Sequence, residues 1–281
     1  MTEGGPSSAE SAHPRSQRWA ACVEYDGRGF SGLQIQAHAP SVQGELERAL
    51  SQIAAHPVSI HAAGRTDAGV HAFAQLVHFD STAPRVSHAW LMGANTLLDD
   101  RVSLRWVSPV SAEFHARFSA QARSYRYVIH NTQARSALLH GRVAWVRQTL
   151  DAERMHQAAQ CLLGERDFSS FRAAHCQSNS PMRFVEAVSV RRYGDFVLVE
   201  ITANAFVHHM VRNIVGSLLW VGEGRQPVEW LAQVQQAADR NQSGPTAPAA
   251  GLYFAQARYP AEFDLPAMPL PWFPLSLVPA S

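Results

Sequence analysis

The sequence predicts an α+β protein built from two tandem ferredoxin-like (βαββαβ) halves, which form a mixed, mainly antiparallel sheet with a central active-site cleft. Strand-like alternation and helical periodicity follow one another in the order β-α-β-β-α-β in the first half, and the same order returns in the second. An apolar content of 46% in 281 residues is enough to bury the core of such a sheet. We expect the cleft where the halves meet to hold the functional site.

In the first half, residues 41–54 carry a clear helical signal. Ser41 is suited to cap the helix N-terminus, and apolar residues recur on one face after it. A second amphipathic helix is expected at 86–98, where apolar residues again recur three or four positions apart. The strands of this half are expected at residues 18–25, 58–63, 71–79 and 102–107.

The second half begins with an alternating strand in which Tyr125, Tyr127 and Ile129 share one face. Gly194 and Asp195 form a two-residue turn signal between two further strands, which predicts a hairpin. Strands are therefore expected at residues 123–130, 183–193, 196–204 and 251–259, and helices at 151–163, at 207–221 and from about residue 227.

The ends of the chain differ in composition from its middle. No apolar run reaches the roughly 18 to 20 residues of a membrane span, and the first residues do not resemble a signal peptide. We therefore expect a cytoplasmic protein without membrane association. The expected parts are a flexible N-terminal tail at 1–17, an N-terminal half at 18–110, a C-terminal half at 111–259 and a Pro-rich C-terminal tail at 260–281.

Charge and cysteine content limit the possible functions. The formal net charge is only +1, but the sequence contains no lysine, and residues 101–150 hold eight arginines against a single acid, Glu113. Such a segment suits a phosphate backbone, while the missing lysine excludes Schiff-base chemistry and a Walker A loop. Cys22, Cys161 and Cys176 are scattered, which argues against a disulfide framework and a cysteine zinc site.

Residues 64–72, with the sequence Gly-Arg-Thr-Asp-Ala-Gly-Val-His-Ala, are the most informative run in the chain. They place Asp67 in a glycine-bounded turn, and the nearby Arg65 favours the ionised form of its carboxylate. An ionised carboxylate at such a turn could act as a nucleophile or a base. The alternative is that Asp67 only forms the turn by bonding to its own backbone.

Residues 27–32 match the dinucleotide-binding pattern G-x-G-x-x-G and follow an expected strand. In that class of fold the helix opens within the glycine motif, whereas the next helix here is expected only near Ser41, and no acidic residue ends a second strand. We therefore reject a dinucleotide site. The segment is better interpreted as a loop whose backbone can approach a ligand.

His208 and His209 suggest a metal site at first sight. Adjacent residues on a helix point about 100° apart, so two imidazoles within the expected helix cannot easily share one ion. We expect one of them to be packed and the other to face the cleft or solvent, with no metal bound. Arg212 stands in an otherwise apolar stretch, where it is either a snorkelling surface side chain or one partner of a buried ion pair.

Residues 167–172, followed by Cys176, Gln177, Ser178 and Arg183, form an expected polar loop. Its mixture of arginine, hydroxyl and aromatic side chains suits contacts with RNA, although a solvated loop would have the same composition.

Four of these features together resemble the tRNA pseudouridine synthase A family. They are residues 64–72, Tyr125, residues 167–172 and residues 206–216, and the resemblance runs from about residue 19 to 259. The last motif, residues 247–254, departs in part from the family pattern. The resemblance implies a homodimer without cofactor or metal, which converts uridine to pseudouridine at positions 38, 39 and 40 of the tRNA anticodon stem-loop.

The resemblance also implies roles for single residues. Asp67 would be the catalytic carboxylate, attacking the base, attacking the sugar or abstracting a sugar proton. Arg65 would help to hold the extruded nucleotide, and Arg212 would pair with Asp67 across the cleft. Tyr125 would stack on the base and is also a candidate to take the C5 proton. Two other functions remain as alternatives. A non-catalytic RNA-binding module has no need of Asp67, and a metal-dependent hydrolase needs more ligands near His208 and His209 than the sequence supplies.

Overall fold

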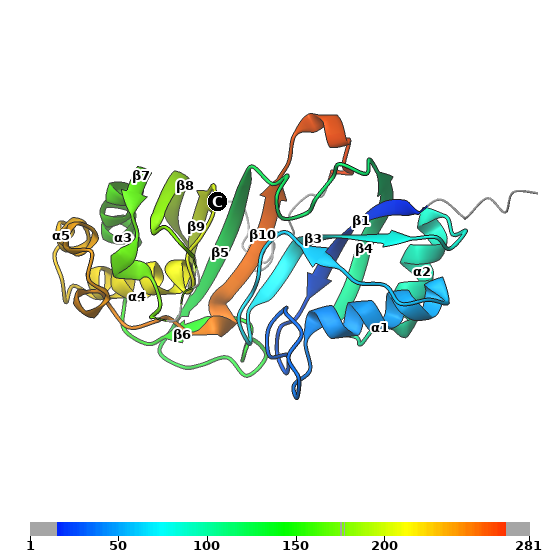
Figure 1. Cartoon of the computed structure of the whole chain (residues 1–281). Coiled ribbons are helices and arrows are strands. Elements are labelled where there is room, and N and C mark those ends of the chain that lie inside the picture. Colours follow the sequence, from blue (N-terminus) through cyan, green and yellow to red (C-terminus); the bar gives the residue numbers. More distant parts are fainter. Residues whose placement is uncertain (1–15, 175, 177, 268–281) are drawn as a thin grey trace, which may run out of the picture.

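One large sheet organises the computed structural model, which describes residues 16–174, 176 and 178–267. Its strands follow the order β4-β1-β3-β10-β5-β9-β8-β7, with β2 beside β3 and β6 beside β5 (Figure 1). The pairs β3–β10 and β5–β6 are parallel, and the other pairs are antiparallel. The structure thus has the predicted α+β class with a mixed, mainly antiparallel sheet.

The strands are β1 (Gln17–Tyr25), β2 (His61–Ala62), β3 (His71–Ser81), β4 (Val102–Val110), β5 (Ala122–Asn131), β6 (Ala144–Val146), β7 (Gly164–Asp167), β8 (Met182–Tyr193), β9 (Phe196–Ala203) and β10 (Leu252–Arg258). The α-helices are α1 (Val42–Ala54), α2 (Ser87–Leu97), α3 (Ala152–Ala159), α4 (Met210–Gly222) and α5 (Trp230–Ala237).

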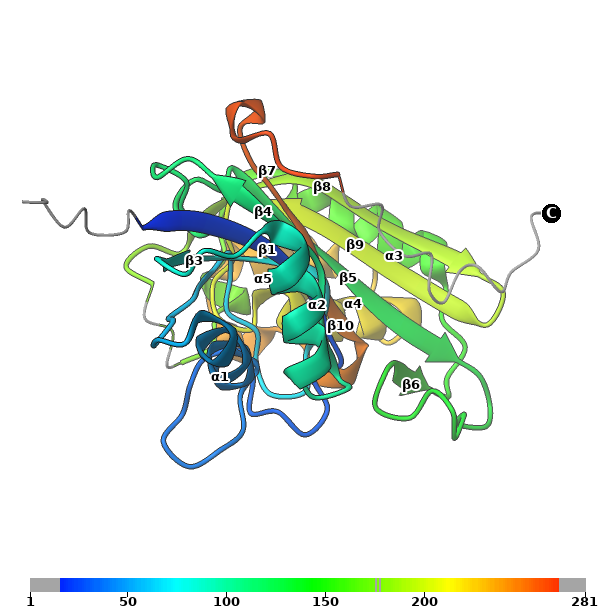
Figure 2. The ribbon, with the colours of Figure 1, turned by 90° about the vertical axis from the view of Figure 1, so that its right-hand side faces the viewer.

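Strand β10 joins the two halves of the sheet. It pairs in parallel with β3, where Tyr253 lies opposite His71 and Phe254 opposite Ala72, and in antiparallel with β5. Helices α1 and α2 lie beside the strands of the first half, as Figure 2 also shows, and α3, α4 and α5 lie beside those of the second half (Figure 1). The last strand of the second half is therefore also a neighbour of the first half.

The helical pattern in the sequence correctly predicts part of the core, because the apolar residues on one face of α1 are buried. The Ser41 side chain accepts a hydrogen bond from the backbone N–H of Gly44 and caps α1, as expected. Trp90 of α2 lies 6.0 Å from Trp19 and 5.1 Å from Phe79, measured between ring centroids. These side chains belong to one apolar cluster that continues into the second half.

Strand β2 is shorter than the expected strand at 58–63. The backbone N–H of Val58 donates to Ser51 Oγ at 2.9 Å, and that of Ile60 donates to Glu47 Oε1 at 2.9 Å. Side chains of α1 thus satisfy donors that a strand partner would otherwise take. Only His61 and Ala62 pair with β3.

Strand β7 falls where the sequence analysis expected a helix stop and a polar loop. Its residues, Gly-Glu-Arg-Asp, show no alternation and have low strand propensity, but they pair with β8 at the edge of the sheet. In the turn that follows, Phe168, Ser170 and Phe171 are buried. The two phenylalanines of this expected RNA-contacting loop therefore belong to the core.

The predicted tails at 1–17 and 260–281 lie mostly outside the described residues. Within the described part of the C-terminal segment, Phe263 packs against Phe114, with ring centroids 5.1 Å apart. No helix of the described residues is long and apolar enough to cross a membrane.

Candidate active site

Asp67 lies in the turn that leads from β2 into β3. Its carbonyl oxygen accepts a hydrogen bond from the backbone N–H of Val70 at 3.1 Å, and Gly69 adopts a φ of 76°. The hydroxyl groups of Thr66 and Tyr25 are hydrogen-bonded at 2.7 Å beneath the turn. The Asp67 side chain is 27% exposed, so its carboxylate remains accessible while the turn is anchored below it.

The segment that matched the dinucleotide pattern holds this turn in place. Leu33 donates its backbone N–H to the Thr66 carbonyl oxygen at 3.1 Å. A Cβ atom at Gly32 would lie 2.6 Å from that same oxygen, and Gly32 has a φ of 96° that favours glycine. The backbone of this loop thus approaches the Asp67 turn, which explains the glycine there without a nucleotide.

Arg212, in the first turn of α4, reaches Asp67 from the other half of the sheet. Its Nη1 lies 3.1 Å from Asp67 Oδ2, and its Nε donates to the carbonyl oxygen of Ala247 at 2.8 Å. The side chain is 15% exposed. Of the two readings left open for Arg212, the structure favours the ion pair over the snorkelling side chain.

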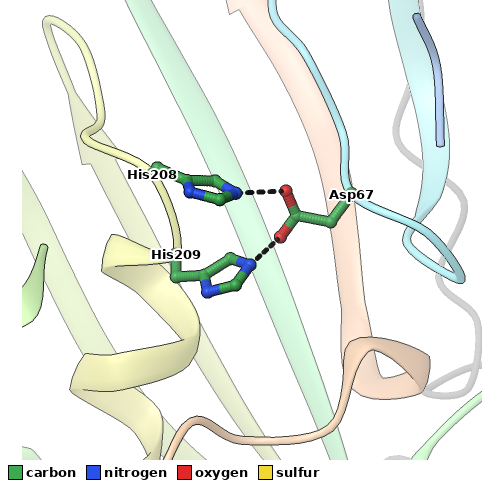
Figure 3. A group of neighbouring side chains, drawn as sticks. All are labelled: Asp67, His208 and His209. Atoms are coloured by element: carbon green, nitrogen blue, oxygen red, sulfur yellow. Dashed lines mark ion pairs between the residues drawn. The ribbon is translucent and has the colours of Figure 1, made fainter. Parts of the chain in front are cut away.

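His208 and His209 also converge on Asp67, which the sequence analysis did not anticipate (Figure 3). His208 Nε2 lies 3.3 Å from Oδ1, and His209 Nε2 lies 3.2 Å from Oδ2. The expectation of a helix from residue 207 was wrong, because His209 has a φ of 63° and α4 begins only at Met210. The 100° spacing argument therefore does not apply to these two residues.

The three side chains offer ligand atoms that all lie within 4.8 Å of one another, a spacing that a metal ion could bridge. However, the Arg212 guanidinium already contacts Oδ2, and a fixed cation opposes a second one at the same oxygen. We therefore interpret the cluster as a carboxylate that pairs with Arg212 and lies against two imidazole rings. That no metal takes part stays a prediction.

The environment of His209 favours its neutral form. Burial lowers the pKa of His209, and His208, Arg212 and Arg240 act in the same direction, whereas Asp67 opposes them. A neutral imidazole with its proton on Nε2 can still donate a hydrogen bond to Asp67.

Tyr125 on β5 lies close to the Asp67 turn but is only 8% exposed. Its ring makes edge-to-face contacts with Phe206 and Phe254, at centroid distances of 4.8 and 5.3 Å. A Cβ atom at Gly64 would lie 3.8 Å from the Tyr125 hydroxyl. Burial, followed by the nearby Tyr25 and Asp67, raises the pKa of Tyr125, so its phenol stays protonated at neutral pH.

Arg65 is exposed on the same turn as Asp67. The guanidinium that the structure places 3.1 Å from the carboxylate is that of Arg212. The position of Arg65 in the chain suggested it as the neighbouring cation, whereas the family resemblance suggested Arg212.

A buried amide supports the Arg212 side of the site. Asn213 donates to the carbonyl oxygen of Phe171 at 2.8 Å and accepts from Thr246 Oγ1 at 2.6 Å and from Arg240 at 3.2 Å. These bonds fix α4 to the segment that supplies the Ala247 carbonyl. Asn213 lies within the matched motif at 206–216, but no pattern in the sequence assigned it a role.

The chain is similar to known proteins over most of its length. Residues 21–119 and 158–260 match a family model described as tRNA pseudouridine synthase. Curated proteins named tRNA pseudouridine synthase A are similar over nearly their whole length. The protein from Aeromonas hydrophila is 56% identical over 92% of this chain and 96% of its own, and that from Shewanella amazonensis is 54% identical over 90% and 97%. The protein from Aliivibrio fischeri is 52% identical over 90% and 97%.

Proposed function

Because the chain belongs to the tRNA pseudouridine synthase family, we propose that Asp67 is the carboxylate with which it isomerises uridine in tRNA. The protein is an isomerase that forms pseudouridine in tRNA. The observation that supports Asp67 most directly is the convergence of Arg212, His208 and His209 on an accessible carboxylate.

The reaction breaks the bond between C1′ and N1, turns the base, and forms a bond between C1′ and C5. The C5 proton is lost and N1 gains a proton, so atoms and electrons balance without an oxidant or reductant. Asp67 would start this sequence by attacking the base, attacking the sugar or abstracting a sugar proton. A carboxylate suits all three routes, because it can act as a nucleophile or as a base.

Three further residues would take part in substrate binding and in positioning the carboxylate: Tyr125, Arg65 and Arg212. Arg212 would hold the Asp67 carboxylate in place, and the exposed Arg65 would contact the flipped nucleotide or its phosphate. Tyr125 would present its ring or its hydroxyl to the base. Because Tyr125 is 8% exposed and flanked by Phe206 and Phe254, contact with a base would be confined to a small part of its ring.

We further propose the anticodon stem-loop of tRNA, at positions 38, 39 and 40, as the target and a homodimer as the active form. The family resemblance supports both. The proposed organisation places Asp67 in a half at 18–110 and Tyr125 and Arg212 in a half at 111–259, with tails at 1–17 and 260–281. A cytoplasmic location agrees with a tRNA substrate.

Tritium release from tRNA labelled at C5 of uridine tests the proposal. Purified protein with excess chelator should release tritium from an anticodon stem-loop that has uridine at 38, 39 or 40, and not from one with cytidine at those positions. A non-catalytic RNA-binding module would release none, and a metal-dependent hydrolase would lose its activity in chelator. Light scattering during size-exclusion chromatography would test the dimer separately.

A further inference from the structure

The backbone of His209 has an unusual conformation for its position in the fold. The non-glycine residues with positive φ in the described chain are Ala55, His209, Ala238 and Asp264. Ala55, Ala238 and Asp264 each directly follow a helix, where a left-handed residue is an ordinary C-terminal cap. His209 instead precedes α4 and makes no side-chain cap there, so capping does not explain its conformation.

The left-handed turn at His209 changes where two consecutive side chains point. Neighbouring side chains point to opposite sides of a strand and about 100° apart on a helix. Here the rings of His208 and His209 lie 4.0 Å apart at 37°, and both Nε2 atoms face Asp67 (Figure 3). The conformation therefore makes possible the contact of both rings with one carboxylate.

Nitrogen atoms face both oxygens of the Asp67 carboxylate. Oδ2 faces Arg212 at 3.1 Å and His209 at 3.2 Å, and Oδ1 faces His208 at 3.3 Å. The carboxylate therefore lies between the guanidinium of α4 and the two rings of the turn that precedes α4.

We propose that the His208–His209 turn is a positioning device, which fixes the orientation of the Asp67 carboxylate. This inference rests on the proposed catalytic role of Asp67. Left-handed residues with a Cβ atom are costly and gather at functional sites, where the surrounding structure holds them. In this proposal, the conformational free energy that His209 costs is offset by faster catalysis, because the carboxylate is already oriented when the substrate enters.

Three substitutions at one position separate the turn from the imidazole ring. His209→Gly and His209→Asn both keep the left-handed backbone, but neither reaches Asp67 as the Nε2 atom does, and each should lower kcat about tenfold. His209→Val removes the ring and disfavours the turn, and kcat should fall by about 10²-fold, as expected for a misplaced catalytic group.

The affinity for tRNA, measured by filter binding, should stay near that of the wild type in all three variants. His208→Ala removes the more exposed of the two rings and should lower kcat less than His209→Gly. The matched control is Ala55→Val, which places the same β-branched residue at a φ of 57° after α1. It should lower the melting temperature and leave kcat unchanged.

Wild-type kcat in His209→Val, or equal kcat in the Gly, Asn and Val variants, would overturn the inference. So would a loss in His208→Ala larger than that in His209→Gly. The outcome for Asp67 itself is separate. If Asp67→Asn is inactive while His209→Val turns over normally, only the positioning role fails, and if Asp67→Asn is active, the proposed function of Asp67 fails as well.

Discussion

Arg212 and Asp67 stand 145 residues apart in the chain, and an ion pair of 3.1 Å joins them. The pair connects the first turn of α4 to the turn before β3, and Arg212 is held in place by the Ala247 carbonyl. The geometry makes four predictions that can be measured.

Replacing Arg212 should lower turnover more than it lowers stability. Arg212→Met keeps the aliphatic stem but removes a charge-assisted hydrogen bond worth about 1.5–3 kcal/mol, so kcat should fall about 10- to 150-fold. Arg212→Lys should fall between Met and wild type, because a point charge cannot bond to both Asp67 and Ala247 in the fork geometry of arginine. Single-turnover tritium release would check this order, and wild-type rates in Arg212→Met would contradict the role of the pair.

Asp67→Asn should abolish pseudouridine formation while the protein stays folded. The side chain is 27% exposed and contributes little to the core, so the free energy of unfolding should change by about 1 kcal/mol or less. Thermal unfolding and filter binding to tRNA provide the controls. Measurable turnover by the pure variant would exclude Asp67 as the catalytic carboxylate, whereas a large fall in melting temperature would indicate a structural turn residue.

Two substitutions of Tyr125 distinguish the packing of its ring from a chemical role of its hydroxyl. Tyr125→Phe should keep the ring contacts with Phe206 and Phe254 and therefore keep the fold. Slow turnover in that variant would assign a proton-transfer role to the hydroxyl. Tyr125→Leu removes the aromatic contacts and should cost about 0.5–1.5 kcal/mol in stability for each of them, in addition to any loss of base contact. If Leu binds tRNA and turns over as the wild type does, no role for this ring in the substrate site remains.

His78 should make the fold sensitive to acid. Burial, together with His115, Arg18 and His61, lowers its pKa to about 4, well below the usual value of about 6.5 for an unfolded chain. The unfolded state therefore takes up this proton first. The associated stability is fully present above about pH 6.5 and is lost as pH falls towards 4, by up to about 3 kcal/mol.

Chemical unfolding between pH 7 and pH 4 would measure this loss. His78→Asn should show a smaller decrease than the wild type, since the side-chain oxygen of asparagine lies near the position of Nδ1 and can accept from the Ala116 backbone N–H, but has no proton to take up. His140→Asn, at an exposed position, is the matched control and should follow the wild type. Parallel pH curves for His78→Asn and wild type would contradict the assignment.

Local patterns predicted much of the fold because their physical causes lie within a few residues. The Ser41 cap, the buried face of α1 and the two-residue turn at Gly194 and Asp195 all depend on neighbours in the chain. The length of β2 could not be predicted in this way, because the backbone N–H groups of Val58 and Ile60 donate to side chains of α1 instead of to a neighbouring strand. Strand β7 was missed for a similar reason, since its pairing with β8 outweighs a composition unfavourable to strands.

The candidate site divides in the same way. Asp67 was visible as a carboxylate in a glycine-bounded turn, and Arg212 as a charge in an apolar helix. The roles suggested for His208 and His209 assumed a helical backbone. That assumption fails because His209 has a left-handed conformation. The burial of Tyr125 depends on Phe206 and Phe254, which come from other elements of the chain, so the strand pattern alone could not reveal it.

The place of β10 between β3 and β5 sets the order in which the protein can be completed during synthesis. Strand β3 is eleven residues long and almost entirely buried, and on that side it pairs with β2 only at Val77 and His78. Its residues His71 and Ala72 have no partner there until residues 252–258 have left the ribosome. A nascent or truncated chain therefore exposes an apolar strand edge of the kind that pairs with other chains. The segment between Ala247 and Phe254, which holds Arg212 and packs against Gly64, arrives at the same late moment. An incomplete chain thus carries Asp67 without the structure that would hold it ready, and such fragments should aggregate rather than act on tRNA.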